Sequence, residues 1–317
     1  MQDRNMRKKR REEDYIASGM IRFNSYRKGH DIAFTLMFIL FAFLCLLPLI
    51  FVFIISLSSD ASIRAVGYSF FPVEWTGTAY QYLWRLRQTV GRAVFNSLFV
   101  TIVGTVLSVF LISTMGYVLS RKHFVLRRFY TVLIFIPMLF SGGLLSTYVV
   151  NTQMLGLKNT YLALILPLAC SSFYIIVMRS FFDVMVPQEV IESGQIDGAS
   201  HIRIFFSLAL PLSKPALATI GLFQSFAYWN DWYQARLYLD SGAKSLFPLQ
   251  YILMNIENNI KLLATNDSFA SAFSGISIPG ESIRMAIVVI TVLPIMLAYP
   301  FFQRYFTSGL IVGAIKG

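Results

Sequence analysis

Charged side chains are scarce in this chain. Only 14% of its 317 residues are Asp, Glu, Lys or Arg, whereas 56% are hydrophobic, and its mean hydropathy is +0.61. Soluble domains carry roughly 25% charged residues. A soluble core cannot absorb such an excess of apolar side chains, but a lipid-facing surface can. The composition therefore excludes an ordinary soluble domain and predicts an integral membrane protein.

The chain also has few residues suited to catalysis or metal binding. Its two cysteines, Cys45 and Cys170, lie inside apolar runs and indicate neither a disulfide framework nor a zinc site. Its three histidines are far apart in sequence and are not clustered with carboxylates. The phosphate-binding pattern G-x4-G-K-[ST] is absent. We therefore expect no catalytic residue, no metal and no cofactor bound by this chain.

Positive charge is concentrated at the N-terminus. The net charge is +11, and basic residues crowd segment 1–31. Such an arm can bind nucleic acid, but it also marks the cytoplasmic side of a membrane protein. Because the apolar run Ile32–Leu57 follows directly, we interpret the arm as a cytoplasmic segment and expect no nucleic-acid partner. The run exceeds the roughly 7–15 apolar residues of a secretion signal, so we expect it to be a retained first span.

Six apolar segments are each long enough to cross about 30 Å of hydrocarbon as a helix. Prolines within them indicate kinks. The segments are Ile32–Leu57, Leu98–Leu119, Phe129–Val150, Tyr161–Phe182, Pro215–Leu239 and Met285–Phe302. We predict an all-α integral membrane fold of about six transmembrane helices. Its parts are a basic cytoplasmic N-terminal segment 1–31, a transmembrane domain 32–306 and a cytoplasmic tail 307–317.

The connecting segments predict the orientation. With the N-terminus inside, eighteen Lys and Arg residues fall on the cytoplasmic side and nine on the outer side. This bias predicts that both termini are cytoplasmic. Two outer segments, Ser58–Ser97 and Asp240–Arg284, are long enough to have a task. Either they bind an outer partner or they are solvated segments without a binding role.

The cytoplasmic segment 187–211, between the fourth and fifth spans, carries signals for two short helices. Pro187 and Glu189 are typical of a helix start. Asp197-Gly198 predicts a break, because glycine permits positive φ. Ser200 is suited to cap a second short helix. A helix–turn–helix with one apolar face suits insertion into a groove on a soluble partner.

The same segment resembles a family motif. Glu192-Ser193-Gly194, three residues, Gly198, and then nine residues to Leu208-Ala209-Leu210-Pro211 resemble the EAA loop (E-A-A-x3-G-x9-I-x-L-P) of the membrane subunits of binding-protein-dependent ABC importers. Ser193, Gly194 and Leu208 depart from the pattern but keep the positions small or apolar. The resemblance, which covers about Arg27 to the end, implies that the loop is a coupling helix docked on an ATPase. The implied coupling residues are Glu189, Glu192, Gly194, Asp197, Gly198, Ala199, Leu210 and Pro211.

Further resemblance lies outside the loop. Trp229-Asn230-Asp231-Trp232 is similar to the family signature W-N-x-[FW] and implies an outer gate or substrate pathway. For Asp231 we favour a structural role at this gate over contact with a sugar. Asn96-Ser97 is similar to the family's outer helix boundary. The tail 279–317 resembles permeases that work with complex-carbohydrate binding lipoproteins.

The resemblance implies a permease subunit of a carbohydrate importer in the bacterial cell (inner) membrane. Implied partners are a second homologous permease subunit, a cytoplasmic ABC ATPase dimer, an extracytoplasmic solute-binding protein and membrane lipid; ATP and Mg would bind the ATPase. Two alternatives stay open: a permease of this kind for a non-sugar solute, and an ion-coupled secondary transporter. The latter would need acids at mid-span or inverted repeats, and neither is visible.

Overall fold

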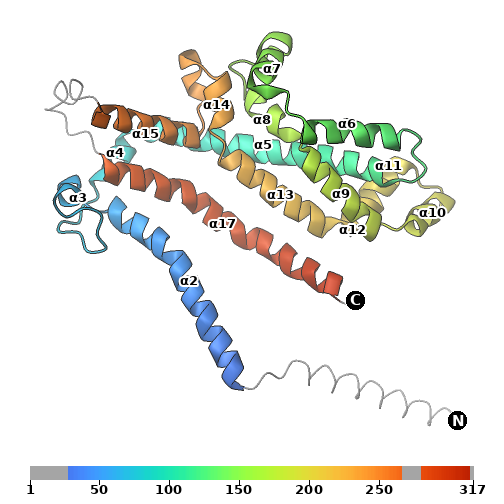
Figure 1. Ribbon diagram of the computed structural model, residues 1–317, viewed down its shortest axis with the longest axis horizontal. Coiled ribbons are helices and arrows are strands. Elements are labelled where there is room, and N and C mark those ends of the chain that lie inside the picture. The colour runs from blue at the N-terminus through green and yellow to red at the C-terminus, as the bar shows by residue number, and fades with distance from the viewer. Residues whose placement is uncertain (1–27, 266–279, 315–317) are drawn as a thin grey trace.

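The computed structural model describes residues 28–265 and 280–314, and every regular element in these ranges is a helix (Figure 1). The basic segment expected at 1–31 lies almost wholly outside the described residues. The helices that build the body are α2 (Lys28–Ser56), α5 (Arg87–Ser120), α6 (Arg127–Leu139), α8 (Tyr161–Ala169), α9 (Ser172–Met185), α13 (Lys214–Trp229) and α17 (Glu281–Ala314). Shorter helices connect them: α3 (Asp60–Val66), α4 (Thr78–Arg85), α7 (Gly143–Val149), α10 (Gln188–Ile196), α11 (His201–Ile204), α12 (Leu210–Leu212), α14 (Tyr233–Tyr238) and α15 (Leu249–Thr265).

Two helices in the described residues are long and apolar enough to cross a membrane, namely α2 from Ile32 and α5. The number rises to five if each of three bent helix pairs forms one span. The expected first span agrees with α2 almost to the residue. The expected second span lies within α5, but α5 begins at Arg87, well before Leu98. At about 1.5 Å per residue its 34 residues measure about 51 Å, more than a hydrocarbon core requires.

The third expected span is not one continuous helix. The chain turns by 118° between α6 and the unit formed by α7 and the π-helical turn Val150–Met154. The break follows Pro137, and Gly143 adopts a φ of +81°, which side chains with a Cβ rarely allow. Figure 1 shows α7 standing away from α6, so this pair is either a broken span or a re-entrant segment.

The fourth and fifth expected spans are bent as well. α8 and α9 meet at 50°, shortly after Pro167, and the α11–α12 segment meets α13 at 80°. α13 ends at Trp229, so the expected span to Leu239 is about ten residues too long. Pro137 and Pro167 lie just before two of the breaks, whereas Pro48 lies inside the continuous helix α2, and Pro294 and Pro300 lie inside the continuous helix α17. The size of each bend depends on tertiary packing. The sixth expected span lies inside α17, which continues through most of the expected tail 307–317.

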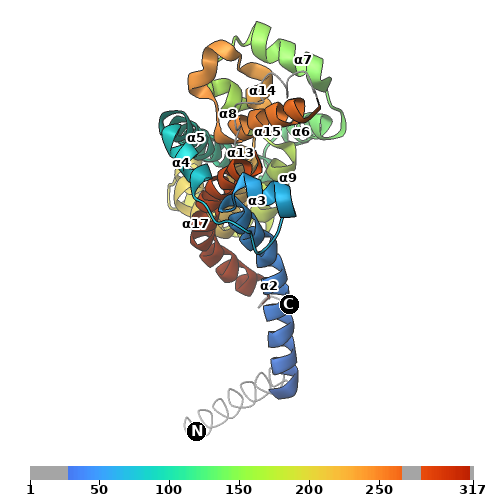
Figure 2. The ribbon, with the colours of Figure 1, turned by 90° about the vertical axis from the view of Figure 1, so that its left-hand side faces the viewer.

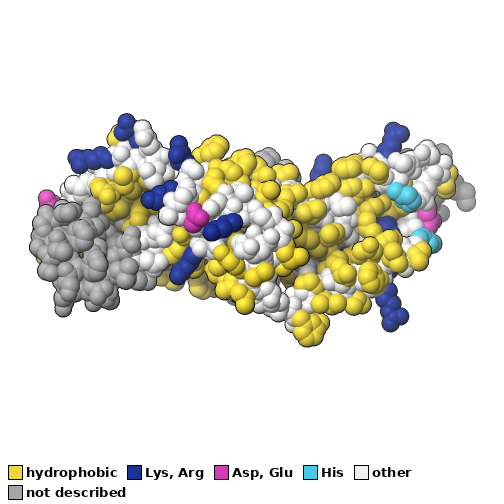
Figure 3. Space-filling view, turned by 90° about the horizontal axis from the view of Figure 1, so that it is seen from above, with side chains coloured by type: hydrophobic (Ala, Val, Ile, Leu, Met, Phe, Trp, Pro, Cys, Tyr) yellow, Lys and Arg dark blue, Asp and Glu magenta, His cyan; other side chains and the backbone are white. Residues whose placement is uncertain are grey.

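The core lies along α5. α5 packs against α8, α9 and α13, and α17 packs against α13 and α2. α2 diverges from the body toward its N-terminal end (Figures 1 and 2), and only 6% of its most apolar window is buried. Seen from above, hydrophobic side chains cover most of the middle of the molecule, while Lys and Arg lie mostly toward its two ends (Figure 3). We call these the α10 end and the α15 end.

The long segments expected to be outer loops are largely helical. Segment 58–97 contains α3, α4 and the first turns of α5, and the described part of 240–284 contains α15 and a short 3-10 helix, Ser241–Leu246. Asp60 ties the first segment to the second: its carboxylate accepts the Gly280 N–H at 3.0 Å and the Ser282 hydroxyl at 2.9 Å. The negative charge of Asp60 thus lies at the N-terminus of α17, where the helix dipole favours it.

Candidate functional site

The segment that resembles the EAA loop forms a helix, a turn and a second helix at the α10 end. Pro187 precedes α10, and Glu189 lies in its first turn, where the helix dipole favours an acid. Asp197 ends α10, and Gly198 follows with a φ of +78°. The Ser200 hydroxyl accepts the Arg203 N–H at 3.3 Å and so caps α11. The expected helix start, break and cap are all present.

Backbone conformation, not crowding, requires glycine at position 198. No atom lies within 4 Å of where a Cβ would stand, but the positive φ disfavours any residue with a Cβ. Gly194 differs: its Cβ would meet Ile204 and Leu208 at 3.3 Å. Gly194 therefore permits close packing of α10 on the segment that follows, whereas Gly198 permits the turn between α10 and α11. Ala199 closes this turn by donating its N–H to the Gly194 carbonyl at 2.9 Å.

One face of the loop is anchored in the core. Ile191 of α10 and Ile204 of α11 are 2% and 0% exposed and belong to one buried cluster with Tyr117 of α5 and Phe182 of α9. The Tyr117 and Phe182 rings meet edge to face, with centroids 5.6 Å apart. Arg121, at the end of α5, stacks on the Tyr117 ring and donates to the Val186 carbonyl at 3.4 Å, just before α10. The loop is therefore joined to α5 and α9 by apolar packing and by this hydrogen bond.

The opposite face of the loop is open. Glu189, Glu192, Asp197 and Pro211 are exposed, and Leu210 is half-buried against the cluster. Large apolar side chains are exposed beside these acids: Val184 75%, Ile196 86%, Ile202 72% and Phe206 52%. Exposed apolar side chains bordered by charges are typical of a protein-binding surface.

Trp229-Asn230-Asp231-Trp232 lies at the other end of the body, between α13 and α14. The Trp229 indole N–H donates to the Thr291 carbonyl of α17 at 3.1 Å. Asn230 accepts from Gln250 of α15 at 3.3 Å, and Trp232 lies under the Arg236 guanidinium. These contacts join α13 to three neighbouring helices. The role of the four residues as an outer gate or substrate pathway stays a prediction.

Two acids near this junction have shifted pKa values. Asp231 lies two residues beyond the end of α13, outside the spanning pair; burial raises the pKa of its carboxyl to about 6, although its oxygens accept the Gln234 N–H. Asp240 is exposed. Hydrogen bonds from Asn159 and the Gly242 N–H, with Lys158 nearby, lower the pKa of its carboxyl. The structural role expected for Asp231 at an outer gate stays a prediction.

A buried polar cluster at the α15 end was not predicted as a site. Asn96 of α5 donates to the Ser245 and Phe247 carbonyls at 2.8 and 3.1 Å and accepts from the Tyr161 hydroxyl at 2.7 Å. The neighbouring Ser97 hydroxyl accepts the Leu249 N–H at 2.8 Å. An Asn-Ser pair at the edge of an apolar run was the available signal, because buried polar groups need partners. Tyr161 lies 65 residues from Asn96 in the sequence, and the other partners lie about 150 residues away.

A close helix contact was also missed. A Cβ on Gly104 of α5 would lie only 2.6 Å from the Tyr228 ring of α13. The Tyr228 hydroxyl donates to the Ile165 carbonyl at 2.8 Å and contacts the Ser108 hydroxyl at 3.1 Å. Gly104 therefore lets α5, α8 and α13 meet, which is a common use of small residues between membrane helices.

The bent apolar helices, and the helical loop that one face anchors in the core, are consistent with an integral membrane permease. The family described as binding-protein-dependent transport system inner membrane component matches residues 108–312. The chain belongs to this family. Its members are transport proteins rather than enzymes.

Individual relatives agree with this assignment. Protein LplC of Bacillus subtilis is 39% identical over 86% of this chain and 90% of its own length. The polygalacturonan/rhamnogalacturonan transport system permease protein YtcP, also of B. subtilis, is 37% identical over 88% of this chain and 95% of its own. A solved bacterial ABC transporter, involved in the import of the acidic polysaccharide alginate, contains a chain with 30% identity and a TM-score of 0.74; the match covers 89% of this chain and 99% of that one.

Proposed function

We propose that this chain is a permease subunit of an ATP-driven ABC importer that moves a carbohydrate across the bacterial cell (inner) membrane. The geometry of the α10 loop carries the proposal: it is fixed to α5 and α9 on one side and exposes acids and apolar side chains on the other. The names of the relatives support a carbohydrate, in particular an oligosaccharide or glycan fragment.

In this proposal the α10 end is cytoplasmic. α17 supplies the sixth span beside α2, α5 and the three bent pairs, and the positive-inside bias of the sequence then places both termini in the cytoplasm. The α15 end faces outward, where α3, α4, α14 and α15 form a helical cap. This cap is the surface for an extracytoplasmic binding protein. A second homologous permease subunit completes the pathway.

The energy comes from a cytoplasmic ATPase dimer that binds ATP and Mg. Glu192 is proposed as the acidic anchor on the ATPase, with Glu189 and Asp197 beside it and Gly198 forming the turn. Closure of the ATPase dimer would move α10, and the Tyr117–Phe182 contact and the Arg121–Val186 hydrogen bond would pass this movement to α5 and α9. The spans would then shift between inward-open and outward-open populations.

Two variants test the loop. Glu192→Lys reverses an exposed charge, and Gly198→Asp places a side chain at positive φ; neither removes a buried contact. We expect both variants to reach the membrane in normal amounts and to lose solute uptake. Normal uptake in both variants would overturn the coupling role of the loop.

A pull-down of the tagged chain in mild detergent tests the assembly. We expect a second permease-like chain and an ATPase to co-purify. Recovery of this chain alone, under conditions that keep a known importer complex together, would favour an ion-coupled secondary transporter instead.

A further inference from the structure

The segment between α3 and α4 exposes large apolar side chains, although it belongs to none of the helices that could cross the membrane. Phe71 is 86% exposed and Val73 is 74% exposed, and Val66 and Trp75 are each more than half exposed. We call segment 66–75 the aromatic loop. Clustered apolar exposure of this kind indicates a binding surface.

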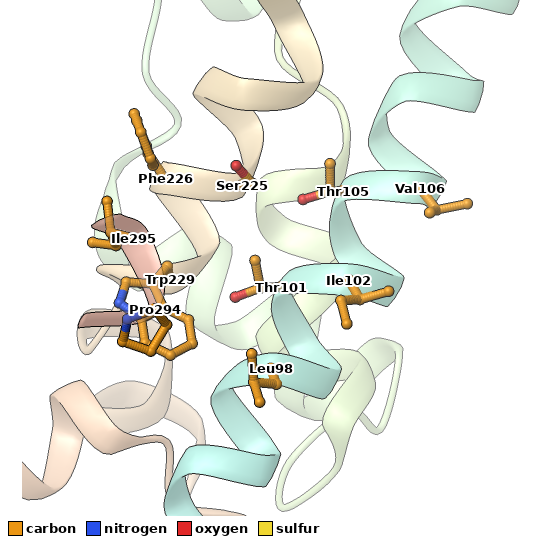
Figure 4. A pocket seen from close by; sticks show the side chains of 10 residues that line it. All are labelled: Leu98, Thr101, Ile102, Thr105, Val106, Ser225, Phe226, Trp229, Pro294 and Ile295. Carbon is orange, nitrogen blue, oxygen red and sulfur yellow. The ribbon is translucent and has the colours of Figure 1, made fainter. Parts of the chain in front are cut away.

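Apolar surface on the spanning helices has a different explanation. Figure 4 shows part of it, a cavity of about 470 Å³ between α5, α13 and α17 that is lined by Leu98, Ile102 and other mostly apolar side chains. Apolar side chains at the level of the spans are at no disadvantage in hydrocarbon, so this surface requires no further partner. The aromatic loop lies beyond the spanning helices, and its exposure needs another reason.

The aromatic loop has a defined shape, because hydrogen bonds close it at its base. The Thr76 N–H donates to the Leu57 carbonyl at 2.7 Å, and the Val73 N–H donates to the Ser62 hydroxyl at 2.9 Å. Leu57 directly follows α2. The base of the loop is therefore fixed to the end of the first span.

The tip of the aromatic loop turns back along α2. The Phe70 ring packs against the Phe51 ring of α2, with ring centroids 4.5 Å apart. Phe51 lies five residues before Ser56, the last residue of α2, which corresponds to about 7.5 Å along the helix axis. Figures 1 and 2 show the segment after α3 beside this end of α2. The tip therefore lies next to the last turns of the first span.

The composition of the aromatic loop suits the edge of a bilayer. Residues 65–73 carry no charge, and the charged side chains of Arg64 and Glu74 flank them. Tyr68 and Trp75 combine an apolar ring with a polar atom, and these two residue types are enriched where a membrane meets water. Lipid therefore fits both the uncharged tip and its flanks.

A soluble protein partner fits the tip less well. Protein interfaces carry about one hydrogen bond per 100–200 Å², and the tip has little to offer for such bonds. Its Ser69 hydroxyl is already used within the loop, where it accepts the Phe71 N–H at 3.1 Å and donates to the Phe71 carbonyl at 3.3 Å. The same bonds pair backbone groups that hydrocarbon would leave unsatisfied.

We propose that the aromatic loop inserts into the outer interface of the lipid bilayer. Phe71 and Val73 reach the boundary of the acyl chains, Tyr68 and Trp75 lie among the phospholipid headgroups, and the charged flanks stay in water. This insertion fixes the depth of α2 at its outer end. The inference rests on the proposed orientation of the chain, and it adds a contact with phospholipid beside the surface proposed for the binding protein.

The test measures depth in the complete transporter, purified through a tag on this chain and placed in lipid nanodiscs. Cys45 and Cys170 are replaced by Ser, and a nitroxide spin label is attached to a single cysteine at Phe71→Cys or Val73→Cys. Ser241→Cys, at an exposed polar position after α14, is the matched control. Collisions of the label with oxygen, which concentrates in lipid, are compared with collisions with a water-soluble nickel complex.

We expect the ratio of oxygen to nickel collisions at Phe71→Cys and Val73→Cys to exceed that at Ser241→Cys about tenfold, as for side chains buried about 5–10 Å into the interface. Equal ratios at the three positions would show that the loop lies in water and would overturn the proposal. Few collisions with either reagent would also overturn it, because another subunit would then cover the loop.

A second pair of variants tests the apolar tip itself. With the label at Val73→Cys, Phe71→Asp should lower the ratio toward the control value, because a charge opposes insertion into lipid. Phe71→Leu should preserve the ratio. If the two variants gave the same ratio, Phe71 would not hold the loop in the bilayer, and the proposal would fail.

An error in the proposed orientation is detected separately. A membrane-impermeant thiol reagent should label Ser241→Cys in intact cells. If it labels only broken cells, the orientation is wrong and the assignment to the outer interface fails with it. If it labels intact cells and the collision ratios are equal, only the insertion of the aromatic loop fails.

Discussion

The two ends of α5 are held by different kinds of contact. At the α10 end, Tyr117 lies among apolar side chains of α9, α10 and α11, and the packing is dense but carries few directional bonds. At the α15 end, Asn96 and Ser97 hold the segment before and at the start of α15 through hydrogen bonds of defined geometry. Apolar surfaces can slide and repack, whereas buried hydrogen bonds specify one arrangement. The difference agrees with the proposal that the α10 end transmits movement and that the α15 end holds an outer cap in one arrangement.

The largest expected effect concerns the apolar contact. Phe182 is fully buried beside Tyr117, so Phe182→Ala should destabilise the protein by about 3–5 kcal/mol through the cavity it leaves. Thermal melting of the purified transporter in detergent would measure this. Phe173→Ala on the same helix is the control, because Phe173 is 54% exposed. Equal melting temperatures for the two variants would show that apolar packing of Phe182 does not stabilise the α10 end.

The next largest effect is expected at the hydrogen bonds of Asn96, at the α15 end. Asn96→Ala removes three hydrogen bonds and leaves the Ser245 and Phe247 carbonyls without their donor, at a cost of about 2–4 kcal/mol. The loss should be local, so limited proteolysis should cut segment 241–249 faster while coupling to the ATPase persists. Asn258→Ala, an exposed site, should change nothing. If the variant lost stability throughout the protein without faster cleavage of segment 241–249, the hydrogen bonds of Asn96 would not hold this segment separately from the rest of the fold.

Two glycines with positive φ separate stability from function. Gly67, at the α15 end, and Gly198, in the α10 loop, both have a φ of +78° and open space around a Cβ. Gly198→Ala should cost about 1 kcal/mol, and Gly67→Ala about 1–3 kcal/mol, because the ψ of −164° at Gly67 lies in a region that is essentially restricted to glycine. Only Gly198→Ala should lower the uptake rate. Equal losses of uptake would mean that the turn at 198 has no special part in coupling.

The smallest expected effect is the pH dependence of protease resistance at the α15 end. The pKa of Asp240 is lowered in the folded protein, so its stabilising contribution is present above the unfolded-state value near 3.9 and is lost as pH falls through the folded value. Resistance of segment 239–247 to an acid-active protease should therefore fall below about pH 4. Asp240→Asn should flatten this dependence. If the protease resistance of Asp240→Asn changed with pH as it does in the wild-type protein, the Asp240 carboxylate would not stabilise this segment.

Much of this fold could be predicted from the sequence, for identifiable reasons. Hydropathy located the first span to within a residue or two, and proline, acid and glycine signals defined the α10 loop correctly, because such signals are local. The 118° turn after α6 could not be predicted, since Pro137 announces a kink but not its size. Nor could the sequence predict that Asn96 bonds the Ser245 and Phe247 carbonyls, or that the Tyr228 ring lies against Gly104, because these contacts join residues more than 100 positions apart.

The candidate sites also differ in how far a local sequence signal predicted them. Glu192 and Gly198 were predicted from a motif, and the structure provides the expected local geometry while their role stays a prediction. Trp229-Asn230-Asp231-Trp232 was predicted as a gate or pathway, and the structure shows these residues joining helices.

The most direct test of the central claim is site-specific cross-linking from the coupling loop in the intact transporter. Both native cysteines, Cys45 and Cys170, are first replaced by Ser, and a single cysteine is placed at Ile196, which is 86% exposed on the loop, or at Val125, which is 94% exposed between α5 and α6. Ile196→Cys should cross-link to a co-purifying ATPase with an efficiency that changes when ATP is added, and Val125→Cys should not. Cross-linking from Val125 alone, or from neither position while the ATPase is present, would contradict the account.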